Sequence, residues 1–274
     1  MSRIEPLCAS NEAEVLAYLA RAPYDNVFVE WLIRSRACSR DDSFVVVSRA
    51  SAGELDGVCY FGRQIVPYAQ SEAALDAFAS RAGSTRTPVM IVGPRPAVER
   101  FWEKAQQHFP VPRALRRSQP VYALDRAHLR GSREDAAVGR AGRADLRELN
   151  GNSAAMFESE LGSIPGGSPA QHLERTRRIL EVGWWWRYRV DGHIVFQCNV
   201  GSQTPGSAQL QGVWTPPAER GKGYATRGLA AICDHLLDEN ATLCLFVNDF
   251  NLDAIALYER VGFFRAGEFA TLLF

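Results

Sequence analysis

The chain has 274 residues, enough for one large domain or two modest ones. Hydrophobic residues make up 46% of it and charged residues 23%, as in ordinary globular proteins, while basic and acidic residues balance at 31 each. That balance gives no support for a nucleic-acid or anionic-membrane partner. No apolar run approaches the roughly 20 residues of a membrane span, and the N-terminus lacks the apolar core of a signal peptide. We therefore expect a cytoplasmic protein.

The cysteines argue against a disulfide framework and against a metal site. There are 6 of them, scattered along the chain without a C-x-x-C pair. They are Cys8, Cys38, Cys59, Cys198, Cys233 and Cys244. We expect buried thiols in a reducing compartment, and no metal cofactor.

Taken in chain order, the first half predicts a mixed succession of helices and strands. Two helices come first, over residues 11–23 and 25–36, with Ser10 as the cap of the first and Pro23 as its stop. The ranges that follow are strands at 43–50, 57–63 and 64–69, a helix at 72–82, a strand at 88–93, a helix at 97–109 and a strand at 120–124.

The second half predicts the same kinds of element. An extended segment at 136–141 precedes helices at 144–161 and 170–183, which a glycine- and proline-rich loop separates. Residues 184–200 read as a hairpin around Asp191-Gly192, a dipeptide that tolerates the positive φ angles of a tight turn. The ranges that follow are a strand at 208–215, an amphipathic helix from Ala225, an apolar strand at 242–247, a short helix ending at Gly262 and a strand at 263–274.

Both halves thus give one order: two helices, three strands, helix, strand, helix, strand. This predicts two copies of one topology, an N-terminal domain over 1–125, a linker at 126–133 and a second domain over 134–274. The copies differ between the third strand and the next helix. The first reads "VPYAQSEAAL" there and the second reads "TPPAERGKGYAT".

The turn of the second copy predicts an anion-binding site. Gly221 and Gly223 let the backbone bend and approach a ligand closely, and the following helix offers unpaired N–H groups and its positive dipole end. Arg220 and Lys222 add positive charge. A phosphorylated ligand fits this arrangement, and only the second copy carries it.

Nucleotide motifs fit the turn poorly, since neither G-x-x-x-x-G-K-[ST] nor G-x-G-x-x-G occurs here. Residues 220–225 instead resemble the R/Q-x-x-G-x-G/A signature of the GCN5-related N-acetyltransferases (GNATs). The preceding "VWTPPAE" looks like that family's V-x-P segment. "NLDAIALYERVGF" resembles its second signature, with Asn251, Ala254, Tyr258, Gly262 and Phe263 in register.

The resemblance covers residues 134–274 and looks closest to the FR47-like branch, through "LFVNDFN" and "GEFATLLF". The first half, with "APYDNVFVEWLIR" and "GVCYFGRQIVP", is similar to an uncharacterised domain often fused ahead of bacterial acetyltransferases. The resemblance implies an α/β fold of two GNAT-like lobes. Each has a mixed, mostly antiparallel central sheet flanked by helices, and the N-terminal lobe is degenerate.

The resemblance also implies acetyl-CoA as co-substrate. Its diphosphate would lie on the N–H groups of residues 221–226, and its pantetheine arm along "LQGVW" where that strand splays from "CLFVN". The expected binding residues are Val213, Trp214, Arg220, Gly221, Lys222, Gly223, Tyr224, Ala225, Thr226, Asn251 and Tyr258. Asn251 serves equally well as a helix cap.

By the same resemblance, Tyr258 is the general acid toward the departing thiolate. The base is open, because the strand "SAQLQGVWT" has no carboxylate where many relatives carry a glutamate, and Gln211 cannot take a proton. Three candidates for the base remain open. They are Glu160 or its neighbour Glu158, His193, and the terminal carboxylate of Phe274.

The expected activity is transfer of an acetyl group from acetyl-CoA to a primary amine of a small molecule or peptide, by direct attack. The alternative is a non-catalytic acyl-CoA sensor or interaction module, which the missing strand glutamate supports. A homodimer is compatible with both hypotheses. We leave Trp184, Trp185 and Trp186 as structural residues of a sheet.

Overall fold

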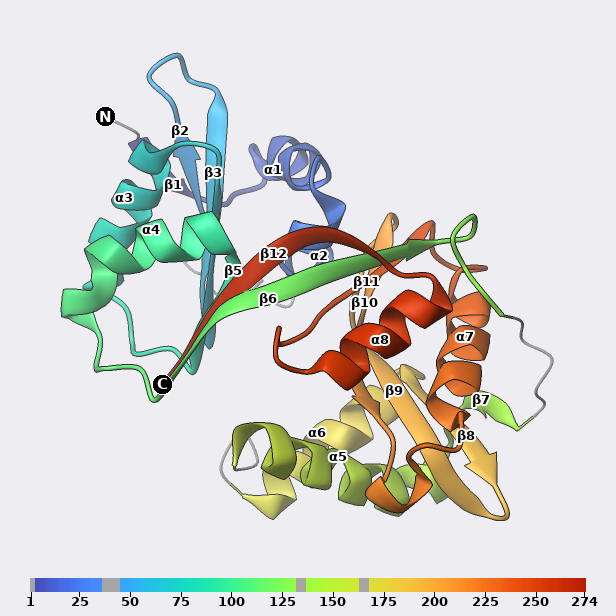
Figure 1. Cartoon of the computed structure of the whole chain (residues 1–274). Coiled ribbons are helices and arrows are strands. Elements are labelled where there is room, and N and C mark those ends of the chain that lie inside the picture. Colours follow the sequence, from blue (N-terminus) through green and yellow to red (C-terminus); the bar gives the residue numbers. More distant parts are fainter. Residues whose placement is uncertain (1–2, 36–44, 132–136, 163–167) are drawn as a thin grey trace. The chain divides into compact units, whose positions relative to one another are not determined.

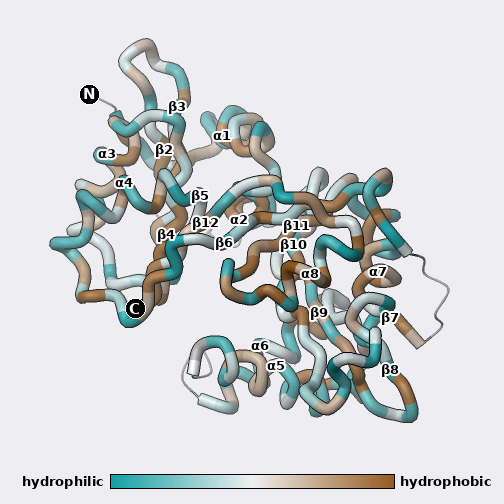
Figure 2. The backbone as a smooth tube through the Cα atoms, in the orientation of Figure 1, coloured by the Kyte–Doolittle hydropathy of each residue, from teal (hydrophilic) through white to brown (hydrophobic). Residues whose placement is uncertain are grey.

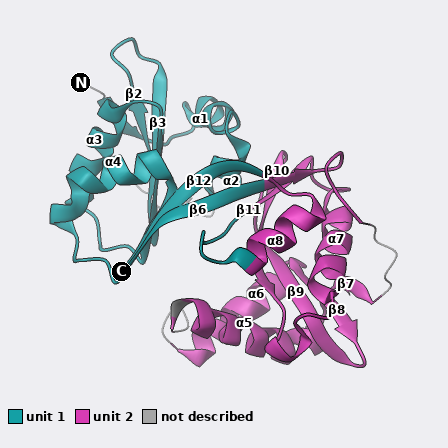
Figure 3. Ribbon diagram, viewed as in Figure 1, with its two compact units in different colours: residues 1–122, 246–252, 265–274 teal, residues 123–245, 253–264 magenta. Residues whose placement is uncertain are grey.

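The computed structural model describes residues 3–35, 45–131, 137–162 and 168–274 (Figure 1). The chain forms two compact units (Figure 3). Unit 1 comprises residues 1–122, 246–252 and 265–274, and unit 2 comprises residues 123–245 and 253–264. The predicted domain boundary after residue 125 lies close to the first crossing between units. The predicted second domain, however, includes two segments that belong to unit 1.

Unit 1 is built on a sheet in the order β1-β2-β3-β4-β5-β12-β6. Its strands are β1 (Arg3–Pro6), β2 (Val45–Arg49), β3 (Leu55–Phe61), β4 (Gln64–Ala69), β5 (Met90–Pro94), β6 (Ala114–Asp125) and β12 (Phe264–Leu273). Its helices are α1 (Glu12–Leu19), α2 (Pro23–Arg34), α3 (Glu72–Ala82) and α4 (Arg95–Ala105). β4 and β5 pair in parallel, whereas β1 to β4 pair antiparallel.

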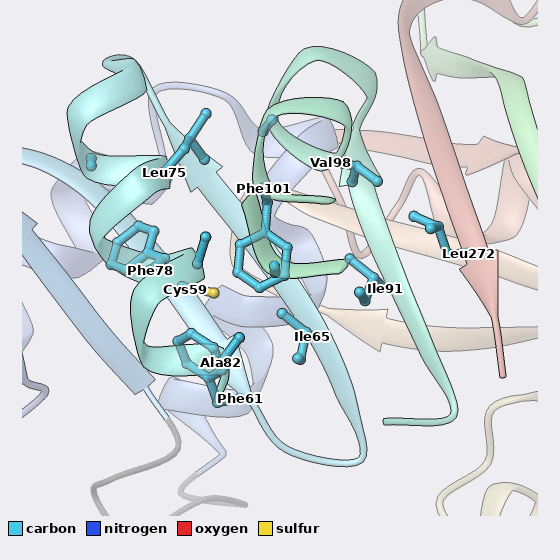
Figure 4. Packing of buried hydrophobic residues seen from close by; sticks show 14 of the residues in the cluster. Cys59, Phe61, Ile65, Leu75, Phe78, Ala82, Ile91, Val98, Phe101 and Leu272 are labelled. Carbon is cyan, nitrogen blue, oxygen red and sulfur yellow. The ribbon is translucent and has the colours of Figure 1, made fainter. Parts of the chain in front are cut away.

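The C-terminal strand completes the sheet of unit 1. β12 pairs antiparallel with β5, from Phe269 opposite Pro94 to Leu273 opposite Met90. The core on one side of this sheet contains Phe78, Phe101 and Ile91, all fully buried, together with Leu272 of β12 (Figure 4). An element from the end of the sequence therefore supplies part of the first unit's core.

Unit 2 repeats this architecture with the strand order β11-β10-β9-β8-β7. Its strands are β7 (Val138–Arg140), β8 (Trp185–Val190), β9 (His193–Gln203), β10 (Ser207–Trp214) and β11 (Thr242–Phe246). Its helices are α5 (Leu146–Leu161), α6 (Pro169–Glu181), α7 (Tyr224–Leu236) and α8 (Leu252–Val261). β10 and β11 pair in parallel, and the other pairs are antiparallel.

The predicted repetition of topology is confirmed. β1 to β6 (the first repeat) and β7 to β12 (the second repeat) follow the same order of helices and strands. The hairpin turn is also confirmed, since Asp191 and Gly192 have φ angles of 48° and 82°. The glycine- and proline-rich segment 163–167 lies outside the described residues.

Three details of the first repeat differ from the prediction. The four-residue strand β1 was not predicted, because "RIEP" is short and contains a proline. α1 begins after Asn11 rather than Ser10, and the Asn11 Oδ1 atom accepts a hydrogen bond from the N–H of Cys8. Pro23 does not stop α1 but opens α2, where its missing N–H costs nothing.

The two faces of the unit 2 sheet are marked by neighbouring tryptophans. The Nε1 atom of Trp185 donates to the backbone oxygen of Thr176 in α6 at 3.2 Å. The ring of Trp186 stacks on His235 of α7, with 5.5 Å between centroids. α6 and α7 thus cover opposite faces, as alternation along a strand requires. In the described residues no helix has the length and apolar character to cross a membrane. Figure 2 shows hydrophilic and hydrophobic positions interspersed along the backbone.

Candidate acyl-CoA site

The first component of the candidate site is the irregular end of β10. Its parallel pairing with β11 runs only from Ser207 to Gln209, whereas β10 itself continues to Trp214. On its other edge the register with β9 shifts between Gln211 and Trp214, so Gly212 and Val213 form a bulge. Gly212 has a φ of 61°. The backbone groups of Leu210 to Trp214 are therefore free of a β11 partner.

The second component is the turn between β10 and α7. Gly221 and Gly223 have φ angles of 74° and 79°, which L-residues with side chains rarely adopt. A Cβ atom at Gly221 would meet nothing within 4 Å, so its glycine serves the backbone conformation rather than a close contact with the protein. Gly221, Lys222 and Gly223 are all exposed. The turn is shaped by the protein but open on its outer side.

The start of α7 is uncapped. Gly223 occupies the N-cap position and no side chain caps this end of the helix. The first helical hydrogen bond runs from the N–H of Arg227 to the oxygen of Gly223, so the N–H groups of residues 224–226 precede the helical ladder. These groups and the positive end of the helix dipole favour an anion.

Cationic side chains surround this helix start. Arg220 lies over the Trp214 ring at 4.8 Å from its centroid, and its Nε atom donates to the oxygen of Thr215. Lys222 forms an ion pair with Glu219 at 3.0 Å.

Two further arginines were not singled out from the sequence. Arg227 lies over the Tyr224 ring, and Arg260 donates to the hydroxyl of Thr226 at 3.1 Å. Arg227 directly follows the quoted turn sequence "TPPAERGKGYAT". Arg260 comes from α8, and no sequence signal connects it with the turn.

Tyr258 lies on α8 and is 6% exposed. Burial raises the pKa of its hydroxyl well above the ordinary value, and the nearby carboxylate of Glu160 raises that pKa further. The phenol therefore keeps its proton throughout the neutral range. Glu160 itself is exposed at the C-terminal end of α5.

The other predicted residues lie on several different elements. Glu158 is exposed on α5, and His193 is exposed at the start of β9. Asn251 precedes α8 and belongs to the segment 246–252 of unit 1; its N–H donates to the oxygen of Asn248. Phe274 is also in unit 1, where its ring packs against Trp102 and Phe109. Its catalytic role stays a prediction.

Comparison with known protein families identifies two segments of the chain. Residues 153–263 match the model of the acetyltransferase (GNAT) family. Residues 153–263 form a GNAT domain. Residues 45–149 match a domain of unknown function (DUF4081), as the resemblance of the first half implies. The described residues contain no cluster of three or more His, Cys, Asp or Glu side chains able to hold a metal ion.

Solved structures share the fold along the entire chain, GNAT domain included. An acetyltransferase of the GNAT family from Colwellia psychrerythraea is 14% identical with a TM-score of 0.61, and 99% of each chain is covered. A Drosophila protein is 14% identical with a TM-score of 0.66, over 99% of this chain and 98% of that one. A tandem GNAT protein from the clavulanic acid biosynthesis pathway is 13% identical with a TM-score of 0.56, over 100% and 98%.

These likenesses establish the fold of two GNAT-like lobes. The comparison with curated protein sequences gives no match.

Proposed function

We propose that the second repeat transfers an acetyl group from acetyl-CoA to a primary amine by direct attack. The observation that carries the proposal is the uncapped start of α7 behind an open turn with two glycines in the left-handed conformation. Such a turn suits the diphosphate of coenzyme A, which would accept hydrogen bonds from the N–H groups of residues 221–226. Arg220 and Lys222 neutralise its charge.

The open edge of β10 suits the pantetheine arm. Val213 and Trp214 lie where β10 has left β11, so their backbone groups are available to amide groups of the arm. The N–H groups of the bulge at Gly212 and Val213 would polarise the thioester carbonyl. Tyr224, Ala225 and Thr226 open α7 beside it, and Asn251 remains a proposed contact of the arm.

The chemistry follows from the thioester. The amine lone pair forms a bond to the carbonyl carbon, the C–S bond breaks, and the amine loses one proton while the thiolate gains one. A thiol has a pKa near about 8.5, so the departing thiolate is stabilised by a hydroxyl donor. Tyr258 holds its proton at neutral pH and would supply that hydrogen bond and proton.

Glu160 is the proposed recipient of the proton that the amine releases. It is the carboxylate whose charge acts on Tyr258, and it lies in the same unit as the turn. Proton release from the tetrahedral adduct is far easier than from a free ammonium group, so an exposed carboxylate is adequate for it.

The alternative is a non-catalytic acyl-CoA sensor. The sequences of β9 and β10 contain no Asp or Glu, which favours this alternative. Incubation of the full chain with acetyl-CoA and a panel of amines separates the two. Transfer predicts release of free thiol together with an acetylated amine in the mass spectrum. Binding of acetyl-CoA without thiol release for any amine would support the sensor instead.

A further inference from the structure

The face of the unit 2 sheet opposite α7 carries a row of side-chain amides. Asn199 of β9 lies directly opposite Trp185 on one side and Gln211 of β10 on the other. Residues directly opposite in a sheet share a face, and Trp185 faces α6, so both amides point away from α7. Gln209 shares this face, because its Oε1 atom accepts from Gln211 Nε2 at 3.2 Å.

Two glycines leave the space in which amide side chains of this row lie. A Cβ atom at Gly212 would lie 2.5 Å from Asn199 Oδ1, and one at Gly201 would collide with the side-chain amide of Gln211. Each amide thus occupies the space of a missing side chain on the neighbouring strand. Gly212 also belongs to the bulge where the thioester carbonyl is proposed to bind, so the row adjoins the reaction centre.

The row continues to an unsatisfied amide. Gln197 is fully buried, and neither of its amide atoms has a hydrogen-bond partner in the described structure. Its cross-strand neighbour Trp214 likewise has a buried Nε1 atom without a partner. Unsatisfied buried groups of this kind each cost about 1–3 kcal/mol, so they are expected to meet a partner that both donates and accepts. Gln211, which is half-buried, is the accessible end of the row.

We propose that this amide row receives the acceptor substrate, and that the substrate is an α-amine beside an amide group, as in a peptide N-terminus or an amino-acid amide. A side-chain amide pairs with a substrate amide through one donated and one accepted hydrogen bond. Gln211 is the half-buried member of the row and its proposed point of contact, whereas Gln197 is fully buried in the sheet against which α5 packs.

The ionisation of the acceptor amine also favours an α-amine as the substrate. An ammonium group has no carboxylate to pair with on β9 or β10, so the row is suited to a neutral amine. The α-amine of a peptide has a pKa of about 8, and an aliphatic amine one of about 10.4. At pH 7 the neutral fraction of the first is roughly 200 times larger. Glu160 does not remove this difference, because a carboxylate is too weak a base to deprotonate an alkylammonium efficiently.

The inference rests on the proposed acetyl transfer and is tested with three acceptors at saturating acetyl-CoA. Alanyl-alanine amide has an α-amine beside an amide, Nα-acetyl-lysine amide has a distant side-chain amine, and 1,4-diaminobutane has no amide. We expect kcat/KM at pH 7 for the dipeptide amide to exceed that for the other two by at least about 100-fold. Equal or better use of either other amine overturns the inference and leaves acetyl transfer standing. Thiol release with none of the three overturns both.

Two variants test the row itself. Gln211→Leu is expected to raise KM for the dipeptide amide about 10-fold or more, with the affinity for acetyl-CoA unchanged. Gln211→Glu places a carboxylate at the row and is expected to shift preference toward 1,4-diaminobutane by about 10-fold or more. If both variants keep the wild-type KM and preference, the amide row does not hold the acceptor. Thermal unfolding of each variant shows that the fold is intact.

Discussion

The two repeats share an order of elements, but the helix after the fourth strand begins differently in each of them. In the first repeat, Ser71 caps α3, and its hydroxyl accepts from the N–H of Ala74 at 3.1 Å. In the second repeat, Gly223 stands at that position and leaves the start of α7 uncapped. The side chain of Ser71 thus satisfies one terminal donor of α3, while no side chain does so at the start of α7.

The comparison teaches that a binding device is separable from the fold that carries it. Both repeats have a parallel pair of strands that such a helix connects, β4 with β5 and β10 with β11. A serine cap with an acidic first turn, Glu72, stabilises the helix itself. A glycine turn with flanking bases lacks that stabilisation, and under the proposed function it receives an anion instead. We therefore expect one acyl-CoA site per chain, in the second repeat.

The largest expected effect comes from removing the proposed proton donor. Tyr258→Phe deletes a buried hydroxyl and keeps the ring that packs near Phe263. We expect turnover to fall about 100-fold or more, because the thiolate leaves without a donor, with the Kd for acetyl-CoA unchanged. Steady-state kinetics and calorimetry measure the two quantities. Unchanged turnover would remove Tyr258 from the mechanism.

The next effect comes from closing the turn. Gly223→Val places a β-branched residue at a φ of 79°, so the turn must rebuild and its N–H groups lose their aim. Loss of two hydrogen bonds of about 1 kcal/mol each raises the Kd for acetyl-CoA by roughly 10- to 100-fold. Gly53→Val is the matched control, since Gly53 has a φ of 89° and open space around it in unit 1. An equal loss of affinity in both variants would contradict a role specific to the turn.

A smaller effect is expected from the exposed lysine of the turn. Lys222→Ala removes a charge that is shared with Glu219, so its pairing with phosphate is partly screened. We expect the Kd for acetyl-CoA to rise about 3-fold at low salt and the difference to shrink at high salt. If the difference in Kd persists unchanged at high salt, the lysine contributes to binding through something other than its charge.

The smallest functional effect is expected in the first repeat. Ser71→Ala removes the cap of α3 and should lower the free energy of unfolding by about 0.5–2 kcal/mol. Neither the Kd for acetyl-CoA nor turnover should change. Chemical denaturation and the transfer assay provide the measurements. A clear loss of acetyl-CoA affinity would mean that the first repeat also contributes to binding.

Much of this difference was readable from the sequence. The succession of elements was predicted because hydrophobic periodicity and the glycine and proline breaks are local features. The turn at 215–226 was predicted as an anion site for the same reason, since glycines, bases and a helix start are contiguous there. The adjacent residues Asp191 and Gly192 likewise predicted the hairpin turn, where both have positive φ angles.

Long-range features were not readable. β6 and β12 are the last strands of their repeats, and nothing in their sequences indicates that β12 joins β5 in unit 1. Arg260 meets Thr226 only because α8 and α7 approach in space. The amide row likewise depends on strand register, because the shifts at Leu210 and Trp214 decide which side chains share a face.

Titration calorimetry of the full chain with acetyl-CoA tests the central claim most directly. The account predicts one binding site per chain, with affinity that Gly223→Val weakens and Ser71→Ala leaves intact. Absence of binding heat, or two sites per chain, would contradict it.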